Sequence, residues 1–225
     1  MARFGRSNLC RRKTEHMNRR RNRGIARIKT RKVAEAKLPT RLGRFRILGF
    51  ESQGGVESAV ALIIGQPQRA RAPLVRIHSQ CLTGDVLGSL RCDCGWQLQT
   101  ALKQIAREKC GVLIYHLQEG RGIGLLNKLL AYELQDRGSD TVEANQQLGF
   151  AADARDYNIC IDILKLLSIK QVRLLSNNPD KIAALERNTI TVVERVPLVM
   201  KPSKMTRKYL AAKMKKMGHL LEGVA

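Results

Sequence analysis

The chain has 225 residues, 44% of them hydrophobic, which is enough for one substantial folded core and excludes a fibrous or disordered protein. Its net charge of +22 lies mostly at the two ends, since residues 1–32 carry +12, residues 200–225 carry +6 and residues 33–199 carry only +4. This distribution argues against a basic nucleic-acid-binding surface over the whole chain. Because no apolar run approaches the roughly 18 residues that span a bilayer, and no secretory signal is visible, we expect a cytoplasmic protein.

Three segments are predicted: a basic, disordered extension over residues 1–32, a folded domain over 33–199 and a basic C-terminal helix or tail over 200–225. Apolar periodicity and turn residues predict strands at 44–50, 59–64, 73–78, 112–115, 171–175 and 191–196. They predict helices from Gly95 to about 105, at 125–137, at 157–167, and from Pro179 with Asn178 as its cap. Strands that alternate with helices indicate a single α/β domain whose loops gather at the strand ends.

Cys81, Cys92 and Cys94 form a C-x10-C-x-C cluster that follows a predicted strand. Thiolates suit zinc, and catalytic zinc sites use three protein ligands and leave a fourth position to water. The alternative is that these are three small packing residues in a reduced interior, as we expect for Cys110 and Cys160. Spacing alone leaves both interpretations open.

A glycine-rich stretch over residues 119–124 lies between a predicted strand and a predicted helix. Glycines let backbone amides approach phosphate oxygens, and a helix N-terminus favours an anion. Arg121 and Lys128 would add positive charge. Such turns are common, so this one gains weight only from the zinc candidate in the same chain, and together they indicate a phosphorylated substrate.

Asp153 and Arg155 lie where a helix is predicted to open. The pattern fits a capping acid with an ion-pairing arginine, and it fits equally well a general base with an anion clamp. Tyr132, inside the helix predicted at 125–137, is either a core aromatic or a hydroxyl donor on a face that lines a pocket.

Five stretches, in this order, resemble the GTP cyclohydrolase II family, and the resemblance covers about residues 32–199. They are residues 76–85, 90–95, 118–128, 140–145 and 148–157. The resemblance implies an α/β (mixed α+β) domain with a mixed sheet flanked by helices. It also implies one zinc per subunit on Cys81, Cys92 and Cys94, Mg²⁺ with the triphosphate, and a homodimer.

The implied reaction opens the imidazole ring of GTP, releases formate and pyrophosphate, and leaves a diaminopyrimidinone ribosyl phosphate as the first step of riboflavin biosynthesis. The implied GTP-binding residues are Arg76, Ile77, His78, Ser79, Gln80, Gln97, Glu119, Gly120, Arg121, Thr141, Ser176 and Lys181. The implied catalytic residues are Tyr132, Asp153 and Arg155. Because a guanidinium stays protonated, we expect Arg155 to clamp charge in the transition state rather than to attack the α-phosphate.

Three features depart from the family pattern. Gln80 replaces the usual glutamate before the first cysteine, Ser176 replaces a common threonine but keeps the hydroxyl, and the segment after Leu198 lacks the usual Gly-Arg-Asn-Pro turn. The contacts of that last segment are therefore open. None of these changes touches the three cysteines or the catalytic residues, so we expect an active enzyme.

Two alternatives are weighed against this interpretation. A paralogue could stop at a formamidopyrimidine or open a different ring, but retention of Tyr132 argues against the early stop. A zinc-stabilised nucleic-acid-binding protein would use its basic ends, but it explains neither the glycine loop nor the near-neutral middle, and 4% aromatic residues offer few stacking platforms. Weak, non-specific polyanion binding by the ends is expected only as a secondary property.

Overall fold

The computed structural model describes residues 30–52, 56–203 and 205–221, so most of the predicted basic extension lies outside the described residues. Its strands are β1 Arg31–Thr40, β2 Gly43–Ser52, β3 Val56–Ile64, β4 Leu74–Ser79, β5 Gly111–His116, β6 Gln171–Leu175 and β7 Thr191–Val196. Its α-helices are α2 Leu82–Asp85, α3 Cys94–Glu108, α4 Leu125–Asp136, α5 Thr141–Gln147, α6 Asn158–Leu166, α7 Pro179–Glu186 and α8 Arg207–Met217. Two 3-10 helices, η1 Pro67–Arg69 and η2 Glu119–Gly122, complete the list. No helix in these ranges is long and apolar enough to cross a membrane.

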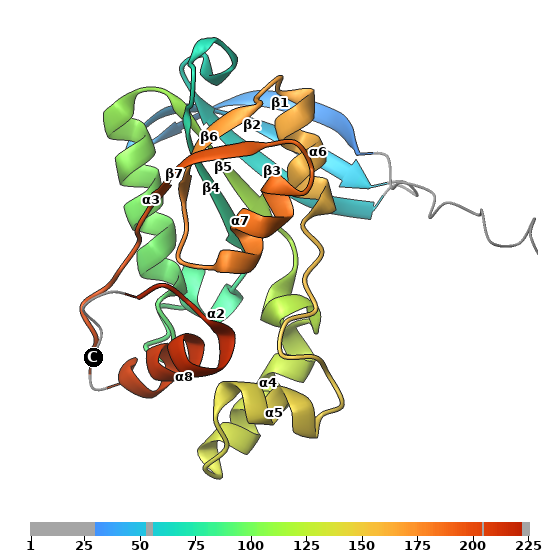
Figure 1. The fold of residues 1–225 in the computed structure, drawn as a ribbon, viewed down its shortest axis with the longest axis vertical. Helices are drawn as coiled ribbons and strands as arrows, with labels where there is room; N and C mark the ends of the chain where they lie inside the picture. The colour runs from blue at the N-terminus through green and yellow to red at the C-terminus, as the bar shows by residue number, and fades with distance from the viewer. Residues whose placement is uncertain (1–29, 53–55, 204, 222–225) are drawn as a thin grey trace, which may run out of the picture.

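The strands form one mixed sheet in the order β1-β2-β3-β5-β4-β6-β7 (Figure 1). The first three strands are an antiparallel meander, and β3 also pairs antiparallel with β5. The remaining pairs, β4 with β5, β4 with β6, and β6 with β7, are parallel. Parallel strands end at the same edge of a sheet, so the loops that follow β4, β5 and β6 gather there, the usual place for a ligand site in such sheets.

Helices cover both faces of the sheet. Side chains on a strand alternate between the two faces, so each strand contributes apolar residues to a core on either side. On β5, Val112 and Ile114 pack with residues of α6 and α7, whereas Leu113 packs with Ala101 and Ile105 of α3. All five side chains are fully buried. This two-sided core holds the sheet rigid and fixes the edge at which the loops gather.

The predicted mixed sheet with flanking helices is confirmed, and the strands predicted at 171–175 and 191–196 have the predicted bounds. The predicted cap of α7 is also present, because the Asn178 side chain accepts a hydrogen bond from the Asp180 amide at 2.8 Å. The one-turn helix α2 was not predicted, and three larger elements also differ from prediction. Strand β1 begins at Arg31 in a stretch for which no strand was predicted, α6 begins only at Asn158, and α5 was not predicted at all.

Each of the three larger differences has a physical reason. Strand β1 is an edge strand exposed along almost its whole length, so it has no alternation of apolar and polar residues to signal it. The acids of 153–156 lie in an irregular loop before α6, where Asp156 accepts from the Asn158 amide at 2.9 Å. Helix α5 begins with a capping box between Asp140 and Glu143, a signal that the sequence does carry.

Candidate active site

The three cysteines of the predicted zinc cluster meet at the gathered loop ends. Cys81 follows β4 and caps α2, whereas Cys94 opens α3 and Cys92 lies two residues before it. The three sulfur atoms lie within 4.8 Å of one another, and the Cys81 and Cys92 sulfurs are 3.7 Å apart. Within the described part of the chain, this is the one group of cysteine, histidine or acidic residues placed to hold a metal ion.

Two glycines allow the sulfurs to converge. A Cβ added at Gly84 would lie 2.8 Å from the Cys92 sulfur and 3.2 Å from the Cys81 sulfur. A Cβ at Gly95 would collide with the Gly84 carbonyl oxygen, so α2 and the start of α3 approach more closely than any side chain would permit. Three soft sulfur donors packed this closely, with no fourth protein ligand among the residues that the structure describes, suggest a zinc site with one open position.

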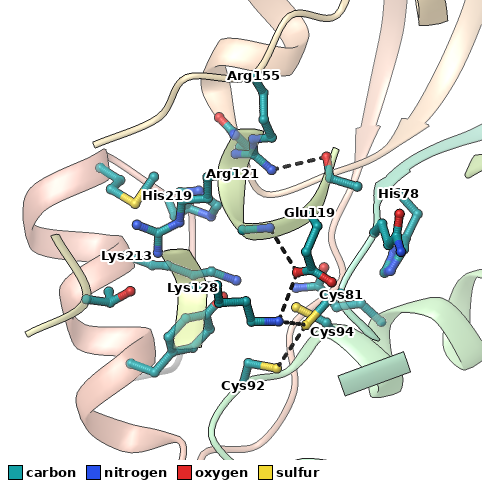
Figure 2. Close-up of a pocket in the computed structure, with 18 of the residues that line it drawn as sticks. His78, Cys81, Cys92, Cys94, Glu119, Arg121, Lys128, Arg155, Lys213 and His219 are labelled. Carbon is teal, nitrogen blue, oxygen red and sulfur yellow. Dashed lines mark hydrogen bonds and ion pairs between the residues drawn. The ribbon is translucent and has the colours of Figure 1, made fainter. Parts of the chain in front are cut away.

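A buried ion pair braces the cluster against the glycine loop (Figure 2). Lys128 Nζ donates to the Cys81 sulfur at 3.2 Å, to Thr83 Oγ1 at 2.9 Å and to Glu119 Oε1 at 2.9 Å. Glu119 in turn accepts from the Leu82 amide at 2.6 Å. Hydrogen bonds from the other two cysteines, together with the Lys128 charge, hold the pKa of the Cys81 thiol far below its usual value. The surroundings therefore favour a thiolate, the form that binds a metal.

Asp85 fixes the loop that carries Cys81. Its Oδ2 accepts from the Cys81 amide at 3.0 Å and from Tyr115 Oη at 2.9 Å, while Oδ1 accepts from His78 Nε2 at 3.0 Å. Burial lowers the pKa of His78, so its imidazole is neutral and carries its proton on Nε2. His78 thus acts as a neutral wall of the pocket rather than as another charge.

The sulfur cluster opens into a pocket with an empty volume of about 970 Å³, its open mouth included. The cationic residues that line it are Arg76, Arg121, Lys128, Arg155, Lys181 and Lys213. Glu119 is the one acid among the described lining residues, and Lys128 already pairs with it. The pocket therefore carries a large excess of positive charge.

Arg76 reaches the pocket from β4 through a chain of buried contacts. Its guanidinium donates to the Leu175 carbonyl at 2.8 Å and to Gln97 Oε1 at 2.5 Å. Gln97 donates to Asp93 at 2.6 Å, and Asp93 also accepts from Lys213 Nζ at 2.8 Å. Burial lowers the pKa of Arg76 to about 10, which still leaves it charged at neutral pH, and its Nε has no partner among the described residues.

Arg155 and Asp153 form a second buried ion pair. The Arg155 guanidinium donates to both carboxylate oxygens of Asp153, through Nε at 2.8 Å and through Nη2, and its Nη1 lies 3.3 Å from Ser79 Oγ. Although burial alone would lower the pKa of Arg155, the bonds and charge of Asp153 outweigh it and raise this pKa above its usual value. Arg155 is therefore a firmly protonated cation in the pocket wall.

Tyr132 projects from α4 toward the cysteine loop. Its hydroxyl lies 3.2 Å from Thr83 Oγ1, and the Arg91 guanidinium lies 4.8 Å from the centre of its ring. Burial raises the pKa of Tyr132, so the phenol keeps its proton. Tyr132 is among the residues that line the pocket, so it is not enclosed in the core, and its role as a hydroxyl donor stays a prediction.

The structure brings most of the predicted site residues to this pocket. The lining includes Arg76, His78, Ser79, Gln80, Gln97, Glu119, Gly120, Arg121, Thr141, Ser176, Lys181, Tyr132, Arg155 and the three cysteines. Ile77 and Asp153 do not line it. The Ile77 side chain packs in the core and only its carbonyl participates, accepting from Lys181 Nζ at 2.9 Å. Asp153 lies behind Arg155 and pairs with it.

Several lining residues were not predicted from the sequence. Asn145, Asn177 and Asn178 belong to this group, and a second set comes from the C-terminal segment: Tyr209, Lys213, Met217 and His219. Asn177 and Asn178 follow β6, and their polarity at a strand end is a usable signal, whereas Asn145 lies in α5, at the end of the stretch 140–145. No local pattern indicates that α8 folds back onto the cysteine loop.

The family model described as GTP cyclohydrolase II matches residues 30–197. A GTP cyclohydrolase-2 of Histophilus somni is 57% identical over 84% of this chain and 88% of that protein. A GTP cyclohydrolase-2 of Yersinia pestis is 57% identical over 86% of this chain and 99% of that protein.

One solved structure, RibBX, a two-domain 3,4-dihydroxy-2-butanone 4-phosphate synthase from A. baumannii, matches 72% of this chain and 38% of its own, with 17% identity and a TM-score of 0.39. So distant a likeness carries no argument. The family match and the sequence identities do, because they span the sheet, the cysteine cluster and the cationic pocket. The chain belongs to the GTP cyclohydrolase II family.

Proposed function

We propose that this protein is a zinc-dependent GTP cyclohydrolase II that opens the imidazole ring of GTP. The products are formate, pyrophosphate and a diaminopyrimidinone ribosyl phosphate, which makes this the first step of riboflavin biosynthesis. The observation that carries the proposal is one pocket in which three clustered cysteine sulfurs face a wall of cations. A metal held by the sulfurs and a triphosphate held by the cations would both lie within reach of one nucleotide.

The cysteine cluster is the proposed zinc site, with Cys81, Cys92 and Cys94 as ligands of one zinc ion per subunit. When bound, zinc lowers the pKa of water and so supplies the hydrolytic power for cleaving a ring C–N bond. We propose that Mg²⁺ enters with the triphosphate. In support, the described residues hold no second cluster of acids, histidines or cysteines at which a metal could bind to the protein alone.

The cationic wall is the proposed triphosphate site. Arg76 Nε and Arg121 Nη2 are buried without a partner among the described residues, and both residues line the pocket. Burial, with the charges of Arg76 and Arg155 close by, lowers the pKa of Lys181 well below its usual value. A bound polyphosphate would offset the repulsion between Lys181 and these two arginines, and it would accept hydrogen bonds from the unpartnered donors. Buried cations are normally stabilised in this way, by an anion that also accepts their hydrogen bonds.

The remaining proposed GTP contacts come from the same loop ends. They are His78, Ser79, Gln80, Gln97, Glu119, Gly120, Thr141 and Ser176. Ile77 is proposed to contribute indirectly, because its carbonyl accepts a hydrogen bond from Lys181 Nζ. Gln80, in place of the family's usual glutamate, offers an uncharged amide at the pocket rim, so it adds no negative charge next to a triphosphate. Tyr132 is a proposed catalytic group. It keeps its proton, so its hydroxyl can donate a hydrogen bond close to the imidazole ring that is opened.

Arg155 and Asp153 are proposed to act as a unit. Arg155 offers a fixed positive charge to the α-phosphate as pyrophosphate departs. Asp153 orients the Arg155 guanidinium by accepting two hydrogen bonds from it. A nucleophilic arginine is disfavoured by this geometry, because the raised pKa leaves no free lone pair. The predicted general-base role of Asp153 stays a prediction.

We further propose a homodimer and a cytoplasmic location. Helix α4 exposes three leucines, Leu126, Leu129 and Leu130, on its surface, and Leu126 is 76% exposed. Contiguous apolar side chains of this kind often mark a subunit contact. Light scattering on purified protein would give the mass of the assembly, and a mass of one chain would contradict the dimer.

A product assay tests the proposed function. Purified, zinc-loaded protein is incubated with GTP and Mg²⁺, and formate and pyrophosphate are measured together, with Cys92→Ser as the control. Both products from the wild type, with formate lost in the variant, are expected. Pyrophosphate without formate from the wild type would mean that the ring-opening step is idle, and absence of both products would point to another substrate.

A further inference from the structure

The C-terminal segment 205–221 forms one wall of the pocket, although the match to the family model ends at residue 197. Helix α8 lies at the same end of the sheet as α2 and the start of α3 (Figure 1). Four residues of this segment line the pocket: Tyr209, Lys213, Met217 and His219. The wall is therefore assembled from a part of the chain to which no role in the reaction has been assigned above.

Contacts on three sides hold this wall in place. Lys213 pairs with Asp93, between two of the cysteines, and both side chains are buried. Lys216 Nζ pairs with Asp140 and, at 2.8 Å, with Glu143, both at the start of α5. The Leu220 amide donates to a carbonyl of the loop after β6, and Leu221 packs against Leu210 of α8. The segment is thus held by contacts with the cysteine loop, with α5 and with the loop after β6.

His219 is the residue of this wall whose chemistry is unused. Its side-chain Nε2 is buried, lines the pocket region and has no hydrogen-bond partner among the described residues. Such orphaned polar atoms are uncommon in folded proteins and call for an explanation, and a position in the pocket lining makes a bound ligand one available partner. In the view of Figure 2, His219 lies on the same side of the pocket as Arg121 and Lys213, across from His78.

The surroundings of His219 select the kind of ligand group. Burial, followed by the charges of Lys213, Lys181 and Arg155, lowers the pKa of His219 to about 3, so the imidazole is neutral. With the proton on Nε2, this neutral ring would be a hydrogen-bond donor surrounded by cations, the arrangement that suits a phosphate oxygen. A base carbonyl oxygen, which carries only a partial negative charge, would gain less from the neighbouring cations than a phosphate oxygen, and an amine group would gain nothing.

We propose that His219 is a substrate-binding residue that donates a hydrogen bond from Nε2 to a phosphate oxygen of the nucleotide, and that α8 positions His219 for this contact. The inference rests on the proposed function for the identity of the nucleotide. It adds a contact from outside the family's motif stretches, and it predicts that phosphate binding depends on the C-terminal segment.

The test measures binding and turnover separately on the full-length, zinc-loaded chain with Mg²⁺. Calorimetry with GTP and with inorganic tripolyphosphate is compared for the wild type, His219→Ala, His219→Gln and Leu220→Ala. Leu220 is the matched control, because it lies next to His219 but its side chain is exposed and does not line the pocket. Formate release from GTP is followed in parallel, and thermal unfolding checks that each variant is folded.

We expect His219→Ala to weaken both ligands about tenfold, the loss of one hydrogen bond to a charged group. The same variant should raise KM for GTP with little change in kcat. His219→Gln, which keeps an N–H donor, should recover most of the affinity, and Leu220→Ala should bind like the wild type.

Unchanged binding in His219→Ala would overturn the inference, as would weaker binding of GTP alone, because the contact would then not be to phosphate. A loss of affinity that follows a loss of stability, without rescue by glutamine, would assign His219 a structural role and overturn it as well. If the wild type released no formate yet both ligands still depended on His219, the proposed function would fail and the phosphate contact would stand.

Discussion

Replacing Gly84 by alanine perturbs the cysteine cluster without removing a ligand. The new Cβ would lie 2.8 Å from the Cys92 sulfur, 3.1 Å from Cys94 Cβ and 3.2 Å from the Cys81 sulfur. Non-bonded heavy atoms pack best at about 3.5–4.0 Å, so the sulfurs must move by several tenths of an ångström. Overpacking of this kind costs about 1–3 kcal/mol. If the strain falls on the metal-bound state, zinc affinity should drop by about 5- to 150-fold, since about 1.4 kcal/mol is tenfold.

The assay is competition for zinc between the protein and a chromogenic chelator, with the zinc content after dialysis as a second measure. Gly49→Ala is the matched control, because a Cβ at Gly49, in β2, would meet nothing within 4 Å. We expect the control to hold zinc like the wild type. Wild-type affinity in Gly84→Ala would refute the reasoning, because it would mean that these sulfurs do not close around a metal in the arrangement described.

Three further predictions concern charges in and near the pocket. Lys128→Met breaks the buried ion pair with Glu119 and should lower the free energy of unfolding, measured in urea, by about 3 kcal/mol. The control Lys103→Met, on the exposed face of α3, should change it by less than about 0.5 kcal/mol. Equal losses in the two variants would contradict the account. Burial lowers the pKa of His116 to about 4, so the unfolded chain binds a proton first as pH falls, and the free energy of unfolding should drop by about 3 kcal/mol between about pH 6.5 and 4. In His116→Gln the free energy of unfolding should fall less steeply over this pH range, as measured by urea unfolding at several pH values. The same pH dependence in the variant and the wild type would contradict the prediction. Arg155→Lys loses the two-pronged contact with Asp153, so steady-state kinetics should give a kcat lower by about tenfold or more, and an unchanged kcat would rule out the clamp.

The sequence predicted the elements whose own residues decide their structure. The strand β6 is a short apolar run between breaking residues, and α7 carries both its proline and its Asn178 cap, so their bounds followed from local chemistry. The exposed edge strand β1 has no such pattern and was missed. Helix α5 could have been found from the capping box of Asp140 and Glu143.

The site was predictable where its residues are close in the sequence. The spacing of the cysteines indicated a metal cluster, and the structure brings the three sulfurs together. Alternation along β4 could also have shown that Ile77, between Arg76 and His78, faces the core rather than the pocket. Lys213 lies 120 residues from its partner Asp93, and no local pattern encodes such a pairing, because it depends on how α8 packs.

The most direct test of the account follows one atom of the substrate. GTP labelled at the carbon between the two imidazole nitrogens is incubated with zinc-loaded protein and Mg²⁺, and the label is followed by NMR. The account predicts that the label leaves the purine and appears in formate with the wild type, and stays in the ring with Cys94→Ser. Label that remained in an intact ring with the wild type, or that reached formate equally fast in the variant, would contradict zinc-dependent opening of GTP in this pocket.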